Sequence, residues 1–169
     1  SIETIDSKVL KLAMDDFTWH QVEEFFPANA SDVKGINFVE YTGESEEEVR
    51  EKIAALSQRL DADTSPNSKR LGYSLAWGST AVNKIWGMRK RAVGLLGNAK
   101  GEARPIPFVE DTAVPPEHLA DFIAEFREVL DAHQLEYGMF GHVDAGVLHV
   151  RPALDMKNPE HEKTAWEIS

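Results

Sequence analysis

The 169-residue chain contains no cysteine. This absence excludes a disulfide scaffold, a thiolate zinc site, a cysteine nucleophile and an iron–sulfur cluster bound by this segment. The chain also lacks any apolar run close to the roughly 18 residues that cross a membrane, and its first residues lack the pattern of a secretory signal. With 42% hydrophobic and 28% charged residues, the composition predicts one folded domain that is not secreted.

Basic residues are scarce: 18 Lys and Arg stand against 29 Asp and Glu, for a net charge of −11. A chain this acidic is a poor candidate for non-specific nucleic-acid binding, and we expect no nucleic-acid partner. Residues 84–104 depart from this balance, with six basic side chains and one acidic one. This basic segment indicates either a specific anion site or a helix face that forms ion pairs with acidic neighbours, and charge alone favours the second.

Apolar spacing, capping signals and turn residues predict alternating helices and strands. Helices are predicted over 7–26 (interrupted), 45–60, 80–96, 115–130 and 159–168, and strands over 36–41, 71–77, 105–110, 137–142 and 146–151. Elements that alternate in this way form layers. We therefore predict an α+β fold, a ferredoxin-like sandwich with a mainly antiparallel sheet and helices packed on one face.

Two histidines in the predicted terminal hairpin form the most informative pair. If the loop is Asp144 and Ala145, His142 lies opposite Val147 and shares a face with His149, at about 7–8 Å between backbones. Two such imidazoles are able to share a metal ion, although a catalytic zinc needs a third protein ligand. A loop longer by one residue would place the rings on opposite faces. Two structural histidines remain the alternative, which the spacing alone favours.

Arg89 is the second candidate residue, on the helix predicted over 80–96. A guanidinium binds a carboxylate through two parallel hydrogen bonds, which suits an organic-acid substrate. An ordinary surface ion pair is the alternative. We interpret the neighbouring acidic residues Glu110 and Asp111 as structural, and the sequence contains no phosphate-binding loop.

Four segments together carry a resemblance to a known family. They are INFVEYTG (36–43), IWGMRK (85–90), EDTAVP (110–115) and GHVDAGVLH (141–149). The chain resembles the C-terminal cap, or substrate, domain of FAD-linked oxidases that act on D-2-hydroxy acids, the D-lactate dehydrogenase, glycolate oxidase and D-2-hydroxyglutarate dehydrogenase family. Val147 stands where the family has an asparagine, so the polar contacts of that amide are not expected here.

The resemblance implies roles for individual residues. His142 and His149 match the family's metal-binding histidines, and the metal is expected to be a divalent ion such as zinc, manganese or iron. Arg89 matches the arginine that binds the substrate carboxylate. The family's catalytic base lies in a later element, so we expect the general base beyond residue 169.

The resemblance also implies that this chain is part of a longer parent. Residues 1–34 are expected to be a helical lead-in from an FAD-binding domain, and residues 35–169 a cap domain that is truncated at its C-terminus. The expected partners are a small organic acid and the FAD-binding domain of the same parent chain. The basic segment contacts either the substrate or FAD. The expected location is cytoplasmic, with peripheral contact to the inner membrane through an unidentified electron acceptor left open.

The expected function is oxidation of a D-2-hydroxy acid (lactate, glycolate or 2-hydroxyglutarate class) to the 2-oxo acid by the FAD-dependent parent. This segment would supply residues that bind substrate and metal, and would be inactive alone. The alternative is a ferredoxin-like small-molecule-binding or regulatory module without catalysis, because a fold by itself does not define a function.

Overall fold

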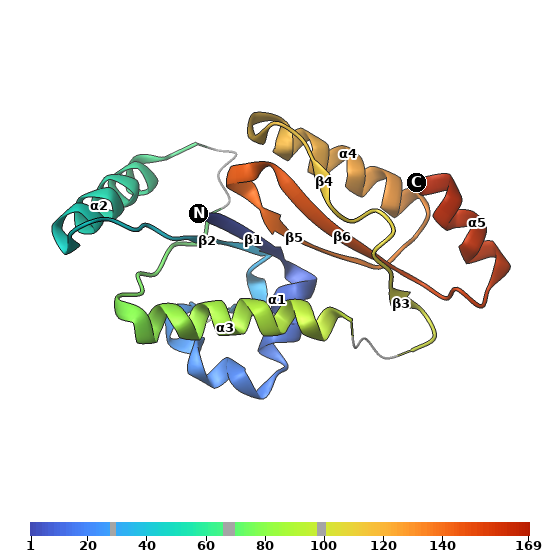
Figure 1. Cartoon of the computed structure of the whole chain (residues 1–169), viewed down its shortest axis with the longest axis horizontal. Coiled ribbons are helices and arrows are strands. Elements are labelled where there is room, and N and C mark those ends of the chain that lie inside the picture. Colours follow the sequence, from blue (N-terminus) through green and yellow to red (C-terminus); the bar gives the residue numbers. More distant parts are fainter. Residues whose placement is uncertain (28–29, 66–69, 98–100) are drawn as a thin grey trace.

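The computed structural model describes residues 1–27, 30–65, 70–97 and 101–169, which form an α+β fold around one antiparallel sheet (Figure 1). The sheet has the strand order β2-β1-β5-β6-β3, and β4 also pairs with β6. The strands are β1 (Ile2–Asp6), β2 (Gly35–Val39), β3 (Arg104–Pro105), β4 (Thr112–Ala113), β5 (Tyr137–His142) and β6 (Val147–Leu154). The α-helices in the described residues are α1 (Ser7–Met14), α2 (Glu46–Ala62), α3 (Gly78–Leu96), α4 (Leu119–Ala132) and α5 (Pro159–Ile168). The predicted α+β class and antiparallel sheet are confirmed.

Helices cover both faces of the sheet, which corrects the expectation that they pack on one face. Met139 and Phe140 are consecutive in β5, so their side chains point to opposite faces. Phe140 belongs to a core with Val9 of α1 and Ala92 of α3, whereas Met139 packs in a second core with Leu130 of α4. Figure 1 shows α1 and α3 on one side of the sheet and α4 and α5 on the other. Four consecutive buried residues in β5 are the signature of a strand covered on both faces.

The first residues form a strand that the sequence analysis missed. Ile5 of β1 pairs with Ile36 of β2 on one side and with Phe140 of β5 on the other. Residues 1–34 therefore contribute a central strand, and β1 is followed by α1 and three short 3₁₀ helices instead of one interrupted helix. The five residues of β1 are too few for periodicity alone to separate a strand from a loop.

Two other predicted strands differ from the structure. Residues 71–77 have no regular secondary structure, and Leu71, Tyr73, Leu75 and Trp77 are exposed. The strand predicted over 105–110 is replaced by the two-residue strands β3 and β4, because the intervening segment leaves the sheet. The predicted cap of α2 is present: Ser45 Oγ accepts a hydrogen bond from Glu48 N at 3.2 Å. In the part of the chain that the structure describes, no helix has both the length and the apolarity to cross a membrane.

Asp6 joins β1 to α1 and ties both to β5. Its Oδ1 accepts hydrogen bonds from the backbone N–H groups of Lys8 (3.0 Å) and Val9 (2.9 Å), and its Oδ2 accepts one from Met139 (2.8 Å). Burial raises the pKa of the Asp6 carboxyl, although these three hydrogen bonds oppose the rise. One buried carboxylate therefore caps a helix and satisfies a buried strand donor.

Replacing Asp6 with alanine is expected to lower the free energy of unfolding by roughly 2 kcal/mol, because it removes a helix cap and leaves buried N–H groups unpaired. Asp6→Asn keeps the cap and should cost less.

The Asp6 carboxyl also makes stability depend on pH. Because its pKa is raised in the folded chain, its contribution to the free energy of unfolding of the wild type decreases as the pH rises from 3.8 through the folded pKa. Neither variant has this carboxyl, so neither should show this pH-dependent contribution. Urea denaturation measures these differences. Exposed Asp121→Ala is the control, within about 0.5 kcal/mol; equal stability of Asp6→Ala and wild type would contradict the prediction.

Candidate functional site

The hairpin of β5 and β6 places both candidate histidines. His142 pairs with Val147, which is the predicted register, but the loop has four residues instead of two. Residues 143–145 form a 3₁₀ turn that ends at Gly146, whose φ is +67° and whose N–H donates to Val143 O at 3.1 Å. The predicted two-residue turn at Asp144 and Ala145 is wrong. Two-residue hairpin turns need residues with a positive φ inside the turn, and in this loop only Gly146 has one. The loop takes one residue from the end of each strand, Val143 and Gly146, so His142 still lies opposite Val147 and the register is unchanged.

The two imidazoles lie on the same face of the sheet. His149 pairs with Phe140, and His142 lies two residues further along β5 than Phe140. The ring centroids of His142 and His149 are 5.3 Å apart, with planes at 85°. The same-face geometry predicted from the hairpin is confirmed, whereas a role in metal binding stays a prediction.

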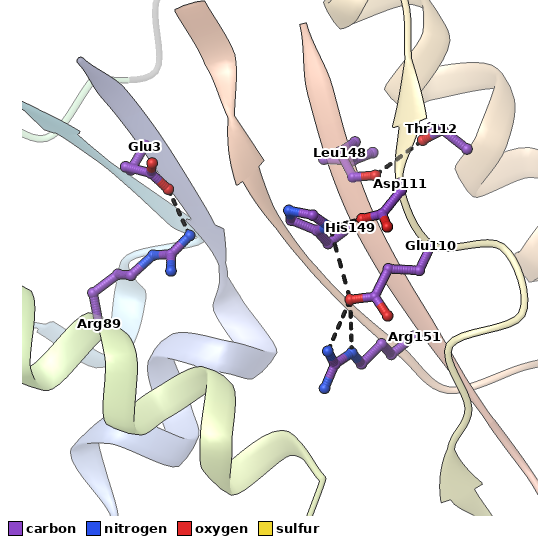
Figure 2. A network of polar contacts seen from close by, with 8 residues as sticks. All are labelled: Glu3, Arg89, Glu110, Asp111, Thr112, Leu148, His149 and Arg151. Atoms are coloured by element: carbon purple, nitrogen blue, oxygen red, sulfur yellow. Dashed lines mark hydrogen bonds and ion pairs between the residues drawn. The ribbon is translucent and has the colours of Figure 1, made fainter. Parts of the chain in front are cut away.

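A carboxylate stands beside the Nδ1 atom of each ring. His142 Nδ1 contacts Glu3 Oε1. His149 Nδ1 is 2.6 Å from Asp111 Oδ1 and 3.7 Å from Glu110 Oε1 (Figure 2). The contact with Asp111 lacks hydrogen-bond geometry, so the buried His149 Nδ1 has no hydrogen-bond partner among the described residues.

Two arginines approach the same aromatic ring. Arg89 of α3 donates from Nη2 to Glu3 Oε2 at 2.5 Å, and its guanidinium lies 5.7 Å from the centre of the Phe140 ring. Arg151 of β6 donates to Glu110 Oε1 from Nε (3.1 Å) and Nη2 (2.8 Å), and lies 5.5 Å from the Phe140 centre. Figure 2 shows Arg89 reaching across from α3 and Arg151 reaching from β6. Both guanidiniums therefore lie on the sheet face that carries the imidazoles.

The donor set on this face fits a divalent metal ion. Ligand atoms of Glu110, Asp111 and His149 lie within 4.8 Å of one another, and His149 retains an unpartnered buried nitrogen. Imidazole nitrogens with carboxylate oxygens suit zinc, manganese or iron. The His142 side chain is 43% exposed and that of Asp111 76% exposed, so the site is open to solvent on this side.

The structure brings the three residues singled out from the sequence into one cluster. Glu3 bridges Arg89 and His142, and His142 contacts His149. Sequence reasoning missed Glu3, because β1 was not recognised as a strand. It also treated Glu110 and Asp111 as structural, although they contact His149. Their place in EDTAVP (110–115), one of the four segments that carry the family resemblance, was the available signal.

The basic segment 84–104 forms ion pairs with the N-terminal part of the chain. These pairs are Lys84–Glu24 (3.4 Å), Arg89–Glu3 (2.5 Å) and Arg91–Asp16 (2.6 Å). The hydrogen bond from Arg91 holds the pKa of Asp16 well below its usual range. This pattern supports the interpretation as an ion-pairing helix face, with Arg89 as the member that reaches the histidine cluster. Lys100 lies outside the described residues.

The fold and the site define an α+β domain that carries paired histidines, carboxylates and guanidiniums on one open sheet face. A family model described as "FAD linked oxidases, C-terminal domain" matches residues 1–169. The chain therefore belongs to this family, as the sequence resemblance indicated, and the family implies FAD as the cofactor.

The chain is also similar to individual curated proteins of one named activity. The chain is similar to D-2-hydroxyglutarate dehydrogenases of Pseudomonas putida (62% identical over 170 residues), Escherichia coli K12 (54% over 171) and Haemophilus influenzae (53% over 171). Each match covers 100% of this chain and 17% of the relative. The chain thus corresponds to a small part of the curated relatives that it matches.

Proposed function

We propose that the parent of this chain is an FAD-dependent dehydrogenase that oxidises a D-2-hydroxy acid of the 2-hydroxyglutarate class to the 2-oxo acid. The observation that carries this proposal is the cluster of Arg89, His142 and His149 on one sheet face in a chain of this family. The names of the relatives support the substrate class. Two guanidiniums near Phe140 also favour a dicarboxylate over lactate or glycolate, because each has N–H groups beyond those that pair with Glu3 and Glu110 and is able to bind one substrate carboxylate with them.

Each residue of the cluster has a proposed task. Arg89 binds the substrate carboxylate and so orients C2. His149 would hold the metal together with a carboxylate of Glu110 or Asp111, and His142, whose ring centre lies 5.3 Å from that of His149, is proposed as a further ligand. When bound, a divalent metal supplies a Lewis acid for the substrate oxygens, and FAD supplies the acceptor for the hydride from C2. The hydroxyl proton goes to a general base, which we place outside this chain.

The remaining partners follow from the same proposal. FAD is bound mainly by another part of the parent, which agrees with the lack of a phosphate-binding loop here. The isolated 169-residue chain is then inactive, because both the flavin and the base are missing. We propose that the parent is cytoplasmic. Any contact with the inner membrane would be made through its electron acceptor, and identifying that acceptor tests it.

The full-length parent tests this function through dye reduction with D-2-hydroxyglutarate, D-lactate and glycolate. We expect kcat/KM for the diacid to exceed that for D-lactate by about ten-fold or more, because a second charge-assisted hydrogen-bonding contact is worth about 1.5–3 kcal/mol. L-2-hydroxyglutarate is the control and should not be oxidised. A regulatory module is supported instead if none of these acids reduces the bound flavin.

A further inference from the structure

A single buried carboxylate lies between the residue proposed to bind substrate and a residue proposed to bind metal. Glu3 is 8% exposed and belongs to β1, where it pairs with His142 across the sheet. Its Oε2 accepts from Arg89 Nη2 at 2.5 Å, and its Oε1 contacts His142 Nδ1. Arg89 is the proposed substrate residue and His142 a proposed metal ligand. One side chain therefore contacts both sites at once.

The contact with His142 determines which ring nitrogen is available. An ionised carboxylate only accepts hydrogen bonds, so the Nδ1 of His142 must carry the proton. The lone pair then lies on Nε2, and a metal ion binds the unprotonated nitrogen. Glu3 thereby selects the tautomer of His142 that binds a metal and fixes the orientation of its ring.

The contact with Arg89 orients the guanidinium in the same way. Glu3 binds one terminal nitrogen, and Phe140 lies 5.7 Å from the guanidinium carbon. The Arg89 Nε is buried and has no hydrogen-bond partner among the described residues. A buried donor without a partner is costly, so an incoming carboxylate that accepts from it gains affinity. The arginine is therefore held with a donor left for an anion.

We propose that Glu3 is a positioning residue that links carboxylate binding at Arg89 to metal binding at His142. This inference rests on the proposed function and extends it to a residue of β1. Asp111 is a weaker candidate for positioning the His149 ring, because its side chain is 76% exposed and its contact with His149 lacks hydrogen-bond geometry. Glu3 has both oxygens engaged and is shielded from water.

Glu3→Gln in the full-length parent tests the proposal. Arg89 and His142 contact different oxygens of Glu3, and in the amide one of these positions becomes an NH2 group that donates, so only one of the two contacts keeps its acceptor. We expect the metal dissociation constant, measured by competition with a chelator, to rise about 10–100-fold. KM for D-2-hydroxyglutarate should rise about ten-fold, because Arg89 is no longer held in place. The visible absorption of the Co²⁺-substituted parent should also change, whereas flavin content should stay at the wild-type level.

Glu40→Gln is the matched control. Glu40 accepts a hydrogen bond from Trp86 Nε1 at 3.3 Å, on the same helix as Arg89, so the variant removes the same charge beside the same helix. We expect its metal affinity and KM to match the wild type. If Glu3→Gln is poorly folded, Glu3→Asp replaces it: the shorter carboxylate cannot span both partners, and metal affinity should still fall by about ten-fold.

Two results separate the inference from the function on which it rests. Wild-type metal affinity and KM in Glu3→Gln, or in Glu3→Asp, would overturn the role of Glu3 while the proposed function stands. A wild-type parent that neither binds a divalent metal nor oxidises 2-hydroxy acids would overturn the proposed function and the inference with it.

Discussion

Replacing His142 with alanine in the full-length parent is expected to lower kcat by about 10³-fold or more, because the loss of a metal ligand removes several kcal/mol of charge stabilisation. His149→Ala should have a comparable effect, and the double variant should be little worse than either, since the two ligands act as one unit. Flavin content should stay at the wild-type level, because FAD is bound mainly elsewhere. Steady-state dye reduction, flavin absorbance and metal analysis of the purified protein measure these effects.

His20→Ala is the control for these variants. The His20 side chain is 80% exposed and its partner, Glu23, is only three residues away, so its replacement should leave turnover and metal content unchanged. If His142→Ala turned over substrate at the wild-type rate, the proposed role of the metal in the reaction would be contradicted. Loss of both flavin and turnover would instead indicate that the variant is misfolded.

Replacing Gly146 with alanine is expected to lower the free energy of unfolding of the chain by about 3 kcal/mol or more, because overpacking against backbone adds to backbone strain. Its φ of +67° is a left-handed conformation, and a Cβ there would lie 1.8 Å from Val114 O. The turn and the segment after β4 are joined by a hydrogen bond from Val114 N to Gly146 O at 3.0 Å. The clash would therefore separate the hairpin from β4, which directly follows Asp111 and so holds it near His149. Urea denaturation measures the loss.

Gly94→Ala is the matched control for that substitution. Gly94 is exposed in α3, and a Cβ there meets nothing within 4 Å. Alanine in a helix interior should raise the free energy of unfolding by roughly 0.5–1 kcal/mol. Opposite signs for the two glycine variants are the expected outcome, and equal stability of Gly146→Ala and wild type would contradict the structural account of the turn.

Local signals predicted much of the fold. The strand over 137–142 and the helix over 159–168 have the predicted bounds, and Ser45 caps α2 as expected. Each of these features depends on residues within a few positions of one another, through capping, turn chemistry or apolar spacing. The missed strands β1 and β4 are short and are held by partners far away in the sequence. Their formation depends on pairing, which local periodicity does not encode.

By itself, the sequence determined that His142 and His149 share a face if His142 lies opposite Val147, and the structure decided that this register is the one formed. The period of a strand and the register of a hairpin are local properties, and Gly146 is the residue that permits the turn. Only the tertiary structure decided which carboxylate meets them. Glu3 is 86 residues from Arg89 and 139 from His142, and it reaches both because β1 pairs with β5 beneath α3. That contact depends on non-local strand pairing and burial, whose energies come from the whole folded chain.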